Sequence, residues 1–297
     1  MKRRTLLLLP LLGVPLARGA AAAAGTGVVI LTDGRIAQYR EALEAAQEAL
    51  REAAVTDLGA ADVAARVQKA AVVLAIGQRA AQLAQASAPS VPVVTCMVLG
   101  SAVTGSRTLT GLRLEVSPDV QLGAFRRVHA GLKRLGVIYQ PKVSGDYVAE
   151  AERIAGGLGI SLVTRPVADA RAVRSALPEL AAGIDALWLL PDPQLITPEM
   201  MNFLLVFTLE RKLPLLGFFD SLTRAGALAS VAPDYRAIGQ RAAKLASELA
   251  ARPAESRVPV PPMSGSPGTI SINLKTARQL GIEVPADVVA AANQVYR

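Results

Sequence analysis

The chain has 297 residues, of which 52% are apolar and 19% charged, and its net charge is +8. This hydrophobicity excludes a disordered chain and is enough for two medium-sized cores. The basic residues are scattered and aromatic residues make up only 4% of the chain, which argues against a nucleic-acid-binding protein because such surfaces combine dense basic patches with stacking aromatics.

The first 24 residues have the pattern of an export signal. A basic start at residues 2–4 precedes an apolar stretch at 6–16 and small residues at 17–24, with cleavage expected near 19–24. The apolar stretch is far shorter than the roughly 20 residues that span a bilayer. No cysteine follows the signal, so we expect a periplasmic protein without a lipid anchor there. The paired arginines allow either the general or the twin-arginine export route.

Short apolar runs follow the signal and alternate with amphipathic segments of helical length. Continuous apolarity indicates strands covered on both faces, as in parallel sheets. The expected strands occupy residues 28–31, 71–76, 91–99, 135–139, 160–163, 184–190, 213–219, 227–231 and 269–272, with 54–58 as a candidate second strand. The expected helices occupy about 34–52, 59–70, 78–87, 118–131, 145–158, 169–182, 198–211 and 235–251, followed by a final helix pair. This alternation predicts an α/β protein with two Rossmann-like lobes and parallel sheets.

Two segments interrupt the alternation and suggest how the lobes are connected. Residues 100–119 are rich in Gly, Ser and Thr, and residues 252–268 are rich in Pro and Ser. We interpret the first as a crossing between lobes and the second as a long irregular connection. The expected division is residues 25–112 plus about 234–260 for the first lobe and 113–233 plus about 261–297 for the second. Such interleaving would form a hinge.

No Walker A loop, GxGxxG, HExxH, GxSxG or CxxC motif is present. The single cysteine, Cys96, lies in an apolar run and is expected to be buried and inert, and the single histidine, His129, is expected near a helix end. We therefore expect no cofactor, no metal site and no catalytic triad, although carboxylates alone would be sufficient for acid-base chemistry.

Open α/β sheets bind ligands beyond the carboxyl ends of their strands, so residues at those ends are the candidates for a ligand site. They are Thr32, Asp33, Gly77, Gln78, Met97, Tyr139, Gln140, Asp192, Phe218 and Asp220.

Three kinds of contact are expected from this set. The helix that begins at Gly77 and Gln78 would hold an anionic group with its free backbone amides. Asp33 and Asp192 would oppose a cationic or hydroxyl group, and the aromatic members of the set would contact an apolar part. Each position also has a structural alternative: Asp33 can cap the helix that follows it, and the aromatic residues can belong to the core.

The segment DALWLLPDPQLITPE, residues 185–199, ends an apolar run at Pro-Asp-Pro. The two prolines restrict the backbone around Asp192, which predicts that its carboxylate faces the space between the lobes. Thr197 is expected to cap the next helix and Trp188 to pack in the core.

Five segments in the second half carry a family resemblance. They are LKRLGVIYQP (132–141), IDALWLLPDPQLIT (184–197), LPLLGF (213–218), GALASVAPDYRAIGQRAA (226–243) and ISINLKTARQLGIEVP (270–285). Together they resemble the ABC-transporter substrate-binding proteins that include the tryptophan- and tyrosine-binding periplasmic proteins. The resemblance implies a type I periplasmic-binding-protein fold that closes on a small molecule without catalysis. The chain has Met97-Val98-Leu99-Gly100 where the family commonly has Asp-Pro.

Three functions are consistent with these features. The first is an exported, monomeric solute-binding protein that captures a small polar ligand, an amino acid or related carboxylate, and delivers it to ABC permease subunits. The second is a periplasmic partner of a sensor kinase or outer-membrane uptake system, with or without a ligand. The third is an enzyme that uses carboxylates in the cleft. Recovery of a kinase ectodomain in place of permease subunits would favour the second over the first. If Asp33→Asn and Asp192→Asn both leave ligand affinity and any turnover unchanged, the site expected for the first and third functions is wrong.

Overall fold

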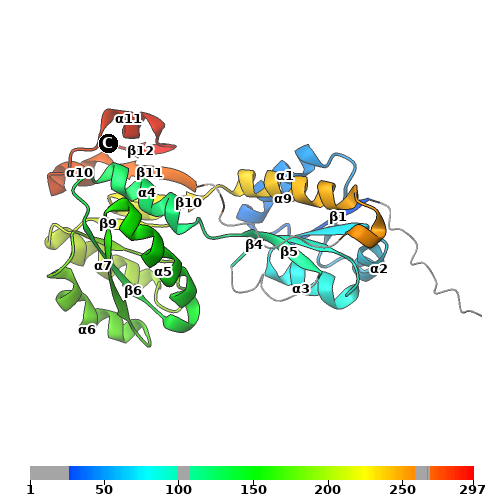
Figure 1. Ribbon diagram of the computed structural model, residues 1–297, viewed down its shortest axis with the longest axis horizontal. Helices are drawn as coiled ribbons and strands as arrows, with labels where there is room; N and C mark the ends of the chain where they lie inside the picture. Colours follow the sequence, from blue (N-terminus) through cyan, green and yellow to red (C-terminus); the bar gives the residue numbers. More distant parts are fainter. Residues whose placement is uncertain (1–26, 100–107, 258–265, 267) are drawn as a thin grey trace, which may run out of the picture.

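The computed structural model describes residues 27–99, 108–257, 266 and 268–297, which form two lobes side by side (Figure 1). Each lobe contains one β-sheet with helices on both faces. The expected signal peptide, residues 1–24, lies outside the described residues. Within the part of the chain that the structure describes, no helix combines the length and apolarity needed to cross a bilayer.

The N-terminal lobe contains a sheet of parallel strands in the order β2-β1-β3-β4-β5. The strands are β1 (Val28–Thr32), β2 (Ala54–Asp57), β3 (Val72–Ile76), β4 (Val93–Val98) and β5 (Leu109–Arg113). Every residue of β1, β3 and β4 is buried, which confirms the interpretation of their apolar runs as strands covered on both faces.

The helices of this lobe are α1 (Ala37–Ala49), α2 (Val63–Gln68), α3 (Gln78–Ser87) and α9 (Tyr235–Ala250). Helix α9 follows the C-terminal lobe in sequence but lies along α1 in the N-terminal lobe (Figure 1). A Cβ placed on Gly239 would lie 2.1 Å from the Ala42 carbonyl oxygen, so the two helix backbones are in direct contact. The N-terminal lobe is therefore built from two separate parts of the chain.

The C-terminal lobe contains a sheet in the order β12-β11-β10-β9-β8-β6-β7. The strands are β6 (Arg134–Tyr139), β7 (Ser161–Pro166), β8 (Ala186–Trp188), β9 (Leu215–Gly217), β10 (Ala229–Pro233), β11 (Gly268–Asn273) and β12 (Gln294–Tyr296). Its helices are α4 (Pro118–Val128), α5 (Pro141–Ala155), α6 (Ala170–Ala181), α7 (Pro198–Glu210), α8 (Asp220–Ala225), α10 (Leu274–Leu280) and α11 (Ala286–Ala291), and short 3₁₀ turns are η2 (Gly156–Leu158) here and η3 (Ala254–Ser256) after α9.

Two elements differ from the sequence-based expectation. Residues 109–113 form β5 at the edge of the N-terminal sheet, inside the segment that we interpreted as a crossing. Strand β11 pairs antiparallel with β10, so the second sheet is not wholly parallel. Because β11 enters from the other lobe after α9, it reaches the sheet from the opposite direction to a strand that follows a βα crossover.

The chain passes from the first lobe to the second between β5 and α4, returns between β10 and α9, and passes again before β11 (Figure 1). At the first passage, Val116 pairs with Ser266 of the last passage in an isolated parallel β-bridge. Two of the three connections therefore run side by side.

Candidate functional site

A cavity of about 370 Å³ lies between the two lobes. The N-terminal lobe contributes Gln38 of α1, Leu99 after β4 and Tyr235 of α9. The C-terminal lobe contributes residues that follow the strands of its sheet, among them Pro191 after β8 and Phe218 after β9. The cavity therefore occupies the position that open α/β sheets use for ligands.

A second cavity of about 180 Å³ adjoins the first and shares Leu99, Glu115 and Pro191 with it. Its other walls come from the start of α5, including Lys142 and Tyr147. Glu115 and Lys142 place a carboxylate and an ammonium group around one cavity. This pair can oppose the two charges of a zwitterion.

Three aromatic side chains, Phe218, Phe219 and Tyr235, line the larger cavity. The rings of Phe218 and Phe219 meet edge to face with centroids 4.6 Å apart. Both residues follow Gly217 at the end of β9, where the chain turns into α8. Burial raises the pKa of Tyr235, which therefore stays neutral at physiological pH. These rings suit an apolar or aromatic group of a ligand.

The N-terminal-lobe candidates occupy two different environments. The Asp33 carboxylate forms an ion pair of 2.7 Å with Arg35, whose hydrogen bonds lower the pKa of Asp33 to about 2. Thr32 is buried, and its hydroxyl has no hydrogen-bond partner among the described residues. Met97 is buried in the core of the lobe with a backbone φ of 60°. None of these three residues lines either interlobe cavity.

The expected anion site at the start of α3 is covered by an aromatic ring. Gly77 precedes α3 with a φ of 97°, and a Cβ placed there would lie 2.5 Å from the Tyr39 ring. Gln78 is exposed and lies outside the interlobe cavities. Because Tyr39 fills the space beside Gly77, a carboxylate cannot approach the helix from that side in this arrangement.

Asp192 differs from its expected position. The residue is 1% exposed and lines neither interlobe cavity, whereas its neighbour Pro191 lines both. One carboxylate oxygen accepts a hydrogen bond of 3.0 Å from the Gln194 amide, as in an Asx turn, and the other has no partner among the described residues. In this structure the Asp192 carboxylate therefore points into the turn and not into either interlobe cavity, and its role in ligand binding stays a prediction.

The remaining C-terminal-lobe candidates are spread along the carboxyl edge of the sheet. Phe218 lines the larger cavity. Tyr139 packs partly buried against the lobe core, and Gln140 donates a hydrogen bond of 2.6 Å to the Ala168 carbonyl beside a separate surface groove. Asp220 accepts a hydrogen bond of 2.6 Å from the Tyr296 hydroxyl. Phe218 is thus the one member of the expected set that lines an interlobe cavity.

Several residues outside the candidate set line the interlobe cavities. Leu99 and Phe219 belong to strand ends that were expected to face a ligand, whereas Glu115, Tyr147 and Tyr235 were not expected there. Phe219 directly follows an expected residue, and Tyr235 begins an expected helix. Glu115 was harder to identify as a cavity residue, because it is a single acidic residue in the segment that we expected to cross between the lobes.

The model of one protein family matches this chain over residues 20–296, and its description is "ABC transporter substrate binding protein". The chain belongs to this family. No curated protein sequence matched the chain.

Solved structures show the same fold for this substrate-binding protein. A ligand-free, open substrate-binding protein with adhesive properties from Clostridium difficile has a TM-score of 0.70 at 18% identity, covering 91% of this chain and 99% of the other. An ABC domain in complex with L-Trp from Streptococcus pneumoniae has a TM-score of 0.61 at 20% identity, with coverage of 91% and 99%. A conserved domain protein from Vibrio cholerae has a TM-score of 0.58 at 22% identity, with coverage of 92% and 99%. The chain has the type I periplasmic-binding-protein fold, as the sequence resemblance implies.

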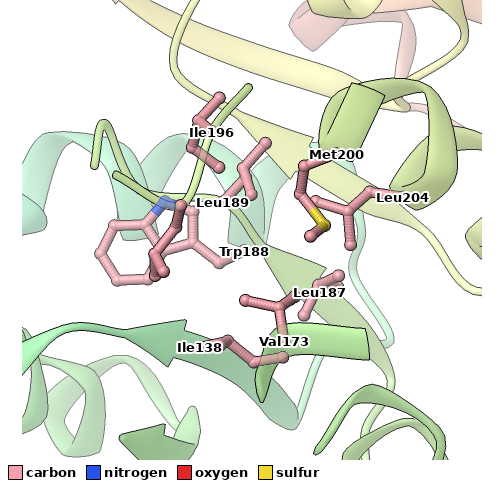
Figure 2. A pocket seen from close by; sticks show the side chains of 9 residues that line it. Ile138, Val173, Leu187, Trp188, Leu189, Ile196, Met200 and Leu204 are labelled. Carbon is pink, nitrogen blue, oxygen red and sulfur yellow. The ribbon is translucent and has the colours of Figure 1, made fainter. Parts of the chain in front are cut away.

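The substrate-binding protein also has a wholly apolar pocket inside its C-terminal lobe (Figure 2). Side chains of Trp188, Leu189, Met200 and Leu204 converge on it, but its volume is about 10 Å³, which is the space for one water molecule. This pocket is a small gap in the core. It is too small to hold a nutrient.

Metal binding has no support in the described parts of the substrate-binding protein. No group of three or more His, Cys, Asp or Glu side chains is close enough there to hold an ion. His129 ends helix α4, and burial lowers its pKa. Burial raises the pKa of the Cys96 thiol to about 12, so it stays protonated and unreactive.

Proposed function

We propose that this chain is an exported solute-binding protein that captures an amino acid, most suitably one with an aromatic or large apolar side chain, between its lobes and delivers it to ABC permease subunits. The observation that carries the proposal is the pair of adjoining cavities with walls from both lobes. A ligand that contacts both lobes favours the closed arrangement, because only that arrangement makes all the contacts.

The chemistry of the walls supports an amino acid. Phe218, Phe219 and Tyr235 offer an apolar surface for a side chain, while Glu115 and Lys142 offer opposite charges for the ammonium and carboxylate groups. The solved neighbour from Streptococcus pneumoniae was crystallised with L-Trp. Because the family consists of substrate-binding proteins, we propose a binding protein and not an enzyme.

The direct test is a thermal-shift screen of the mature chain against L-amino acids and small carboxylates, followed by isothermal titration calorimetry. Ligand at 100 times its Kd should stabilise the protein by about 2.7 kcal/mol. For a hit such as L-Trp, tryptamine and tryptophanamide should bind more weakly, since the first lacks the carboxylate and the second lacks its charge.

Two variants locate the site. Phe218→Ala should weaken binding at least about tenfold, or about 1.4 kcal/mol, because it removes an aromatic wall of the cavity. Phe203→Ala removes the same group from α7, outside both interlobe cavities, and should leave the Kd unchanged. A folded protein that no compound in the screen stabilises, or equal Kd values for Phe218→Ala and the parent chain, would overturn the proposal.

Capture of the native partner tests the delivery step. ABC permease subunits recovered with the ligand-loaded protein from solubilised membranes would support transport. Recovery of a sensor-kinase ectodomain in their place would contradict it.

A further inference from the structure

Within three residues, the first connection between the lobes leaves the core of the N-terminal lobe and enters the core of the C-terminal lobe. The Leu114 amide donates a hydrogen bond of 2.8 Å to the Val98 carbonyl, and its side chain packs against the core of the N-terminal lobe. Val116 is 1% exposed and belongs to the core of the C-terminal lobe. In this connection Glu115 lies between the two anchors, and its carbonyl accepts a hydrogen bond of 3.4 Å from the Ser266 amide of the last connection. Rotation of one lobe against the other therefore changes the backbone at Glu115 together with the other connections.

The anchor at Val116 is a buried hydrogen-bond network. The Val116 carbonyl accepts hydrogen bonds from the Tyr147 hydroxyl at 2.6 Å and from the Gln121 side-chain amide at 3.1 Å. The Gln121 amide also donates to the Tyr147 oxygen at 2.7 Å, and its carbonyl accepts from the Trp188 indole at 3.1 Å. Both N–H donors and the carbonyl oxygen of the Gln121 side chain form hydrogen bonds, which fixes its orientation and that of Val116.

Helix α5 also contacts the N-terminal-lobe side of Glu115, through an ion pair between the lobes. Glu150, one turn after Tyr147, forms an ion pair of 3.4 Å with Arg113 at the end of β5. The two side chains are 24% and 25% exposed, so solvent screens this pair less than a fully exposed one. One helix of the C-terminal lobe thus contacts the connection on both sides of Glu115.

We propose that Gln121, Tyr147 and Glu150 form a hinge clamp on the first connection, which limits the interlobe rotation at Glu115 and sets the orientation in which its carboxylate enters the cavities. The presentation of Glu115 to a ligand rests on the proposed function, whereas the confinement of the rotation does not. Gln121 and Tyr147 are positioning residues here, since they act through the Val116 backbone.

The experiment measures the interlobe distance in ligand-free protein, so its outcome does not depend on whether the cavity binds an amino acid. Dyes on Gln47→Cys of α1 and Lys275→Cys of α10, both exposed positions, report the distance by single-molecule energy transfer. The native Cys96 is buried and stays unlabelled. The full mature chain is used throughout.

Tyr147→Phe keeps the ring and deletes the hydroxyl, and Glu150→Gln removes the charge that holds Arg113. Each variant should broaden the distance distribution and shift its mean relative to the parent chain. Tyr296→Phe is the matched control, because it also deletes a tyrosine hydroxyl that forms a 2.6 Å hydrogen bond, but at a site away from the hinge. This variant should leave the distance distribution unchanged.

Circular dichroism tests whether each variant is folded. If Tyr147→Phe does not fold, Glu150→Gln decides the question alone, because its side chain lies near the surface. Parent-like distributions for the folded variants overturn the clamp. A shift of equal size in Tyr296→Phe also overturns it, since the effect would then not be specific to the hinge.

Discussion

Trp188→Phe should destabilise the C-terminal lobe by about 2–4 kcal/mol. The side chain is 1% exposed, and its rings pack against Phe125 and Tyr147 with centroids 6.3 and 5.9 Å away. The substitution leaves the Gln121 carbonyl without its 3.1 Å donor, which costs about 1–3 kcal/mol, and removes part of a buried aromatic surface, which costs about 1 kcal/mol more.

Urea unfolding followed by far-UV circular dichroism measures this effect, since the variant removes the only tryptophan and with it the fluorescence signal. Gln121→Met should be destabilising as well. The double variant Trp188→Phe/Gln121→Met should lose less than the sum of the two, because the indole and its acceptor disappear together. Strict additivity, or a loss below about 1 kcal/mol for Trp188→Phe, would refute the reasoning that this buried hydrogen bond matters.

Three further outcomes are expected. Gly239→Ala should lower the calorimetric melting temperature of the N-terminal lobe, with a cost of about 1–3 kcal/mol, because its Cβ would overlap the Ala42 carbonyl; an unchanged transition would contradict this contact. Asp33 should titrate by NMR near the pKa of about 2, below its usual 3.8, and Arg35→Met should raise that pKa. The Asp33 interaction therefore stabilises the folded state above about pH 4 and is lost as the pH falls toward 2; equal Asp33 pKa values in both proteins would exclude the ion pair as the cause. Cys96 should react with a thiol reagent only after unfolding, because the folded chain buries it; rapid labelling of native protein would show otherwise.

Much of the fold could be predicted from the sequence because the signal was local. Continuous apolar runs became buried strands, and amphipathic spacing became helices such as α1 and α9. Strand β5 was missed because its sequence LTGLR lacks a continuous apolar run. Its burial depends on Gly111, whose missing Cβ allows the backbone to approach Thr95, and such a contact between strands leaves no local pattern.

The candidate site was harder to predict than the fold. Strand ends could be located, but not the side chains that occupy the space beyond them. Tyr39 covers Gly77, and the Asp192 carboxylate turns inward to the Gln194 amide. Both outcomes depend on where neighbouring elements place their side chains. Glu115 was missed because the connection between lobes has no periodic pattern that separates a cavity residue from a solvated one.

The return of α9 to the N-terminal lobe also has a consequence for the order in which the protein can fold. Arg236 of α9 binds Glu48 of α1 although the two residues are 188 positions apart in the chain. The first lobe therefore cannot complete its helical layer until nearly all of the chain has been synthesised, and contacts of such long range form slowly. The sheet of the C-terminal lobe is likewise incomplete until β11 and β12 have been synthesised. Neither lobe can be finished early, which keeps the growing chain incompletely folded until its last fifth has emerged.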